Sequence, residues 1–198
     1  FLLSQIYKVT FYIYYNLFLE RGFKDPIVMA NFGTICQLNN EINKAIDIYK
    51  NSIKLFPKSP NSYNNLGSLL IDLERLEEAE NYIRKALNIN PNFAMAQNNL
   101  GSLLINQDKY LEAEVAIRKA IKLNPNLEKA YTNLGNILLN QGNREEAELF
   151  TRKAIELNPN SADAYKNLGA ILREMNRISE SELNMRKAIE IEPNNAEA

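Results

Sequence analysis

The sequence contains no histidine, and its only cysteine is Cys36. Without histidine it lacks both the commonest general base and the commonest metal ligand, which excludes most familiar hydrolase and metalloenzyme schemes. A single cysteine cannot form an internal disulfide, so cysteine usage leaves the redox compartment open. We therefore expect a chain that is not an enzyme and that carries no cofactor and no metal.

Glycine, proline and net charge are also scarce. Seven glycines and seven prolines in 198 residues argue against a β-rich or disordered chain. The 23 Lys and Arg residues nearly cancel the 24 Asp and Glu residues, which leaves a formal charge of -1. Because a nucleic-acid binder usually shows a basic excess or a dense basic stripe, we expect no nucleic-acid partner.

Short catalytic motifs are missing as well. The chain has no GxGxxG, Walker loop, CxxC, HExxH or GxSxG motif. Each of these motifs has a known role in catalysis or in phosphate binding. Its glycines are spread at regular intervals and do not cluster into a phosphate-binding loop.

A period of 34 residues dominates what is present. Glycines with an apolar residue before them recur at this interval, at Gly33, Gly67, Gly101, Gly135 and Gly169. Prolines do the same, at Pro57, Pro91, Pro125, Pro159 and Pro193. These spacings divide the chain into repeats 1 to 5, with the ranges 26–59, 60–93, 94–127, 128–161 and 162–195. Positions are numbered below from the first residue of each repeat.

Further positions keep the same period. Position 4 is Met29, Tyr63, Gln97, Tyr131 and Tyr165; position 20 is Ala45, Ala79, Ala113, Ala147 and Ser181; position 27 is Ser52, Ala86, Ala120, Ala154 and Ala188. In the first half of a repeat, positions 4, 7, 8 and 11 form the i, i+3, i+4, i+7 stripe of an amphipathic helix. The pattern resembles the tetratricopeptide repeat (TPR) family over about 170 of the 198 residues. The resemblance implies an all-α fold, a right-handed superhelix of helix-turn-helix repeats, and a role in protein–protein interaction.

Physical chemistry explains these positions independently. Glycine costs about 1 kcal/mol of helix propensity relative to alanine, so its recurrence at position 8 predicts a second helix that approaches too closely for a Cβ. Cys36 falls on the same core stripe, where we expect a buried structural thiol. The second helix is expected to carry i, i+4 ion pairs on a solvated outer face. These pairs are Glu80–Arg84, Glu114–Arg118, Glu148–Arg152 and Glu182–Arg186.

Both ends of the chain depart from the pattern. Residues 1–25 fit either a degenerate preceding repeat helix buried against repeat 1 or a separate apolar helix that makes a homo-oligomer contact. Residues 1–19 are apolar enough to allow membrane contact, although Lys8 disfavours a span. The segment lacks the charged n-region and cleavage site of a signal peptide, and we expect a cytoplasmic location. Residues 196–198 look like the start of a truncated sixth repeat.

Position 6 is asparagine in every repeat. With about 100° per residue, positions 2, 5, 6, 9 and 13 lie opposite the core stripe, and the TPR resemblance places this face on the concave side of the superhelix. Because an amide both donates and accepts hydrogen bonds, a row of amides can pair with the backbone of an extended peptide. The predicted peptide-binding residues are Asn31, Asn64, Asn65, Ser68, Asp72, Asn98, Asn99, Ser102, Asn106, Asn133, Asn136, Asn140 and Asn167.

Two interpretations of this row stay open. It resembles the asparagine ladder in the TPR region of O-linked N-acetylglucosamine transferase, which holds extended substrate segments. Alternatively, AT-rich coding places asparagine at any exposed position. A carboxylate clamp is disfavoured, because the basic candidates Lys129, Lys166 and Arg173 are opposed by acidic residues on the same face.

The leading hypothesis is thus a non-catalytic scaffold that binds extended segments of a protein or peptide partner. The alternative is the substrate-recruiting arm of a larger enzyme, such as a glycosyltransferase or sulfotransferase.

Overall fold

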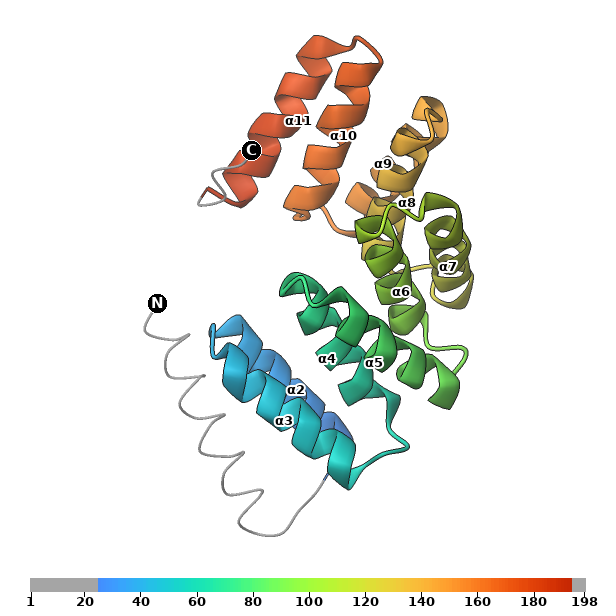
Figure 1. Ribbon diagram of the computed structural model, residues 1–198. Coiled ribbons are helices and arrows are strands. Elements are labelled where there is room, and N and C mark those ends of the chain that lie inside the picture. The colour runs from blue at the N-terminus through green and yellow to red at the C-terminus, as the bar shows by residue number, and fades with distance from the viewer. Residues whose placement is uncertain (1–24, 194–198) are drawn as a thin grey trace. The chain divides into compact units, whose positions relative to one another are not determined.

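The computed structural model describes residues 25–193. Within that range the chain is all-helical, with ten α-helices and no strand. This confirms the predicted all-α fold of helix pairs (Figure 1). The expectations for residues 1–24 and 196–198, including membrane contact and a homo-oligomer contact at the N-terminal segment, lie outside the described residues.

The helices fall into two compact units, divided between Ile89 and Asn90. The N-terminal unit contains α2 (Pro26–Leu38), α3 (Ile42–Leu55), α4 (Pro60–Asp72) and α5 (Leu76–Ile89). The C-terminal unit contains α6 (Ala94–Asn106), α7 (Tyr110–Leu123), α8 (Glu128–Asn140), α9 (Arg144–Leu157), α10 (Ala162–Glu174) and α11 (Ile178–Ile191). Even-numbered helices are the first helices of their repeats, and odd-numbered helices are the second.

Each first helix packs against its second helix at the glycine of position 8. A Cβ on Gly67 would lie 2.6 Å from Ile83 Cγ1, and one on Gly169 would lie 2.9 Å from two atoms of Met185. In the other three repeats, a Cβ on the position-8 glycine would also meet the side chain at position 24. This side chain is Tyr49 in repeat 1, Ile117 in repeat 3 and Thr151 in repeat 4. The small residues at positions 20 and 27 are all buried. The close approach predicted from the recurring glycine is therefore confirmed.

A left-handed residue at position 15 ends every first helix. It is Asn40, Glu74, Asp108, Gly142 or Asn176, with φ between 58° and 80°. The next N–H then donates back to the carbonyl of position 11, as from Arg75 to Leu70 at 2.9 Å. This is the Schellman arrangement, and it fixes the angle at which the second helix returns.

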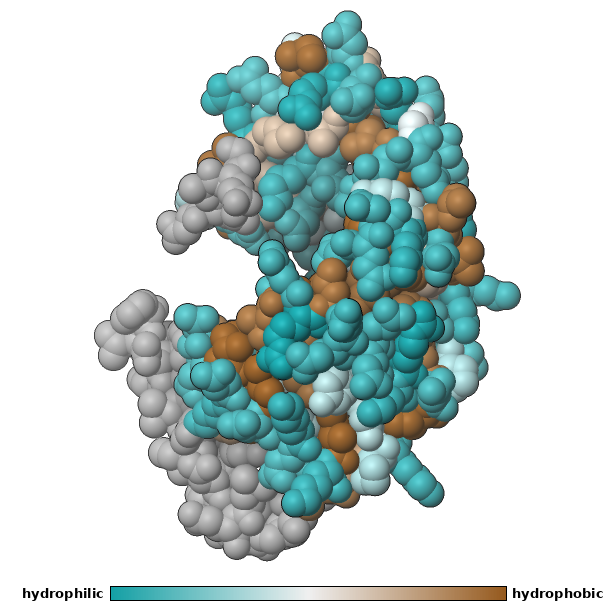
Figure 2. Space-filling view, viewed as in Figure 1, coloured by the Kyte–Doolittle hydropathy of each residue, from teal (hydrophilic) through white to brown (hydrophobic). Residues whose placement is uncertain are grey.

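Both polar and apolar side chains are exposed on the surface. Figure 2 shows a predominantly hydrophilic face with separate hydrophobic patches. Exposed apolar side chains include Val115, Leu149 and Leu183, which share position 22 of the second helices. Other large apolar residues, among them Leu66, Ile83, Leu134 and Ile137, are fully buried between helices.

Candidate interaction site

The position-6 asparagine of repeat 2 joins three helices of the N-terminal unit. Asn65 on α4 donates from Nδ2 to the hydroxyl of Thr34 on α2, at 3.4 Å. That hydroxyl lies 3.1 Å from the hydroxyl of Tyr49 on α3, and Asn64 donates to Asn65 Oδ1 at 3.2 Å. Burial raises the pKa of Tyr49, so its hydroxyl stays neutral. The asparagine thus ties its repeat to the preceding one without any charge.

The C-terminal unit repeats this connection twice. Asn133 on α8 donates to Asn98 Oδ1 on α6 at 3.1 Å, and Asn98 donates to Asn99 Oδ1 at 3.5 Å. Asn167 on α10 donates to the main-chain carbonyl of Thr132 on α8 at 3.3 Å. In both cases position 6 of one repeat reaches position 5 of the repeat before it.

Accessibility divides the predicted residues into three groups. Asn31, Asp72, Asn106 and Asn140 are exposed. Asn65, Ser68, Asn99, Ser102, Asn133, Asn136 and Asn167 are half-buried. Asn64 and Asn98, at position 5, are buried with 1% and 5% of their surface exposed.

Position 5 therefore differs from the prediction, which placed it on the open face. A helical wheel shows which residues point away from the partner helix of the same repeat, but it does not show the neighbouring repeat. Position 5 points toward that neighbour, as the bond from Asn133 to Asn98 shows. Thr34 and Thr132 stand at positions 9 and 5 of the predicted face but are not among the predicted binding residues; they accept bonds from the next repeat through a hydroxyl and a main-chain carbonyl respectively.

The charges near this face compensate one another. Lys166, one of the basic candidates for a carboxylate clamp, pairs with Asp163 at 2.8 Å. Glu174 pairs with Arg144 at 3.4 Å. Exposed charges such as Asp72 and Lys129 remain on the first-helix face, whereas its half-buried positions are mostly amides and hydroxyls that form neutral hydrogen bonds.

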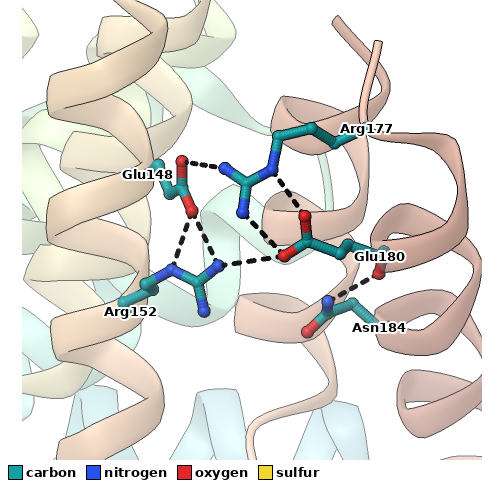
Figure 3. A network of polar contacts seen from close by, with 5 residues as sticks. All are labelled: Glu148, Arg152, Arg177, Glu180 and Asn184. Carbon is teal, nitrogen blue, oxygen red and sulfur yellow. Dashed lines mark hydrogen bonds and ion pairs between the residues drawn. The ribbon is translucent and has the colours of Figure 1, made fainter. Parts of the chain in front are cut away.

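The second helices carry the four predicted i, i+4 pairs, and all four are present. The structure adds ion pairs between repeats that the sequence rule did not predict. Glu148 accepts hydrogen bonds from Arg152 of its own helix and from Arg177 of repeat 5, and Arg177 also contacts Glu180 (Figure 3). The two hydrogen bonds from Arg177 hold the pKa of Glu180 below its usual range.

Neither a metal site nor a membrane span is found in residues 25–193. No group of three or more acidic or cysteine side chains in this range is arranged to hold an ion. None of the described helices is both long enough and apolar enough to cross a membrane.

The chain belongs to the tetratricopeptide repeat family. Four tetratricopeptide-repeat families match it, at residues 60–93, 94–127, 128–161 and 150–182. Together these matches span residues 60–182, which is more than half of the 198 residues. No curated protein matches the chain significantly in sequence.

Solved structures share the fold along most of the chain. The crystal structure of YrrB, described as a TPR protein with an unusual peptide-binding site, is 25% identical with a TM-score of 0.58, over 90% of this chain and 92% of that one. A crystal structure of MamA is 25% identical with a TM-score of 0.62, over 84% and 97%. TTC0263, a thermophilic TPR protein of Thermus thermophilus, has 16% identity and a TM-score of 0.75, over 87% and 94%, and shows the fold alone. The repeats and these relatives support a protein-interaction scaffold.

Proposed function

We propose that this scaffold is non-catalytic and binds extended peptide segments of a protein partner along the first-helix face of each unit. The observation that carries the proposal is the asparagine at position 6, which is exposed or half-buried in all five repeats: Asn31, Asn65, Asn99, Asn133 and Asn167. These five residues are called the amide row below. YrrB, a TPR protein described as having an unusual peptide-binding site, adds support for the same kind of partner.

The chemistry of the row suits a peptide backbone. A side-chain amide has two N–H groups and a carbonyl with two lone pairs, so the single bond from Asn133 to Asn98 uses only part of its capacity. That bond also holds the amide in a fixed orientation before any partner arrives, which lowers the entropy cost of binding. The buried Asn98 acts here as a positioning residue, and Asn64 does the same for Asn65.

The amide row predicts a weak dependence of affinity on both peptide sequence and salt. Backbone groups are common to all peptides, and neutral hydrogen bonds are little affected by screening. Exposed and half-buried residues beside the row, such as Ser102, Asn106, Asn136 and Asn140, widen the same face. Asn140 donates to the Asn136 side chain at 3.0 Å, so these two amides would act together.

The test uses the three row residues of the C-terminal unit. Peptides selected on the parent chain from a random display library serve as probes, and fluorescence anisotropy measures their affinity. Each lost bond contributes about 0.5–1.5 kcal/mol, so changing Asn99, Asn133 and Asn167 together to alanine should weaken binding by about 2–4 kcal/mol. Single changes should have modest effects, and the parent affinity should change little between low and high salt.

A matched control comes from the turns that end repeats 2, 3 and 4. Asn92, Asn126 and Asn160 recur at position 33 with the same period, and all three are exposed in the turns. Changing them together to alanine removes as many amides but should leave peptide affinity unchanged. Equal affinity of the folded row variant and this control would mean that the row reflects composition, and the proposal would be wrong.

A further inference from the structure

Repeat 5 lacks an aromatic ring that repeats 2 and 4 possess. At position 23, repeat 2 has Tyr82 and repeat 4 has Phe150. Each ring lies near the tyrosine at position 4 of the same repeat, with centroids 6.4 Å apart for Tyr63–Tyr82 and 6.2 Å apart for Tyr131–Phe150. Repeat 5 keeps the tyrosine at position 4, Tyr165, but has Asn184 at position 23.

The surroundings of Phe150 show what such a ring contacts. The guanidinium carbon of Arg118 lies 5.5 Å from the centre of the Phe150 ring. Ile121 packs with Phe150 against the cluster that contains Tyr131. The half-buried ring thus lies beside a tyrosine of its own repeat and an arginine of the preceding one, and an isoleucine of the preceding repeat packs against the same cluster.

The corresponding side chains of repeats 4 and 5 line an open cavity where repeat 5 lacks the ring. The residues one period later are Arg152, Ile155 and Tyr165, and together with Leu168, Asn184 and Glu156 they line a cavity of about 280 Å³. The Asn184 side chain does not replace the ring, because its amide donates to the main-chain carbonyl of Glu180 on its own helix at 2.8 Å (Figure 3).

The wall of the cavity is held in place. Arg152 is fixed by Glu148 at 2.7 Å and by Glu180 at 3.9 Å (Figure 3). Arg152 and Glu156 are exposed, so the cavity reaches the surface. A second cavity of about 340 Å³ shares Tyr165 and Asn184 with the first, which leaves room for the chain that would present a side chain.

We propose that this cavity binds one aromatic side chain, of phenylalanine or tyrosine, presented by a protein partner. The ring would take the place that Phe150 occupies in repeat 4, between Tyr165 and the guanidinium of Arg152. Aromatic rings favour offset or tilted contact with another ring and attraction to a cation over their face. Pockets for drug-sized ligands measure roughly 300–1,000 Å³, so about 280 Å³ suits a single side chain. This site lies among α9, α10 and α11 and is independent of the amide row.

The experiment uses N-acetyl-phenylalaninamide as the probe and N-acetyl-leucinamide as the aliphatic comparison. Both are titrated into the isotope-labelled full chain and followed by the backbone amide signals in NMR. The aromatic probe should produce saturable shifts at Ile155, Tyr165 and Asn184, with an affinity at least tenfold higher than that of the aliphatic probe.

Two substitutions at one position separate filling of the cavity from loss of the asparagine. Asn184→Phe should abolish the shifts and raise the melting temperature, because the chain then supplies its own ring. Asn184→Ala, which leaves the cavity open, should retain binding within about twofold. The triple change of Asn99, Asn133 and Asn167 should also retain it.

The proposal fails if the aromatic probe gives no saturable shifts, or if it binds no better than the aliphatic one. Unchanged binding to Asn184→Phe would overturn it as well, since the probe would then occupy another place. Loss of binding in both Asn184 variants would assign the effect to the asparagine amide, which also contradicts a ring-shaped site.

Discussion

Between repeats 3 and 4, the first helices meet through amides while the second helices meet through an ion pair. Asn133 donates to Asn98 at 3.1 Å on one face, and Arg118 lies 3.0 Å from Glu146 on the other. The amide contact is part-buried and neutral, whereas the side chains of the ion pair are 42% and 43% exposed.

The junction of repeats 4 and 5 shows the same division. Asn167 reaches the carbonyl of Thr132 on the first-helix face, and Arg177 joins Glu148 to Glu180 on the second-helix face. One period of 34 residues therefore links neighbours in two chemically different ways. The links on the second-helix face are ion pairs, which salt screens, whereas the links on the first-helix face are neutral hydrogen bonds.

The largest expected effect comes from breaking the contact on which both faces depend. Gly101→Leu inserts a side chain where Ile117 already fills the space between α6 and α7. We expect a loss of about 3 kcal/mol in the free energy of unfolding through overpacking, measured by urea denaturation with circular dichroism. Asn106→Leu, at the exposed end of the same helix, is the control and should change stability little. A variant that unfolds at the same urea concentration as the parent would contradict the close contact at position 8.

The next largest effect should come from the second-helix face. Glu148→Ala removes the carboxylate shared by Arg152 and Arg177. The Glu148 side chain is only 15% exposed. We expect a loss of about 1–2 kcal/mol in low salt and a smaller loss in high salt. Glu182→Ala breaks the exposed pair with Arg186 and should cost at most about 0.5 kcal/mol. Equal losses for the two variants would mean that the ion pairs between repeats add nothing.

The first-helix face should respond less, and without any dependence on salt. Asn133→Ala removes the bond to Asn98 and should lower the free energy of unfolding by about 0.5–1.5 kcal/mol. Urea midpoints of variant and parent, compared at two salt concentrations, measure this directly. The loss of stability in Asn133→Ala should be the same at both salt concentrations. If it shrinks in high salt, as expected for Glu148→Ala, the two faces do not differ in this way.

The smallest effect concerns pH. Hydrogen bonds from Gln141 and Arg118 hold the pKa of Glu114 below its usual value of 4.5. The folded state therefore favours the carboxylate, and this stabilisation is complete above pH 4.5 and is lost as the pH falls through the lower folded pKa. Glu114→Gln should destabilise the chain at neutral pH, and the gap to the parent should narrow at about pH 3. A gap that stays constant or widens on acidification would contradict the direction of the shift.

Local features of this fold follow from the sequence, because they depend on spacing within one helix or one helix pair. The glycine contact at Gly67 and the pair Glu80–Arg84 are both confirmed. Features between repeats do not follow in the same way. The burial of Asn64 and the pair Arg177–Glu148 depend on how one repeat packs on the next. A helical wheel or an i, i+4 rule describes a single helix and does not predict this packing.

The cavity beside Tyr165 could be predicted from the sequence only in part. An alignment of the repeats shows asparagine in repeat 5 where repeats 2 and 4 have Tyr82 and Phe150, but only the packed side chains show that residues 25–193 leave a cavity there. The peptide-binding role of the amide row remains a prediction that the binding measurements test.

The lone cysteine makes the first repeat observable by itself. Cys36 is 1% exposed, and burial together with Glu41 raises its pKa to about 11. Since the thiolate is the reactive form, an alkylating dye at neutral pH should react only during moments when α2 separates from its neighbours. The labelling rate would then report the opening equilibrium of that end of the array, in the natural sequence and without an added probe. A partner that rigidifies the N-terminal repeats would register as slower labelling.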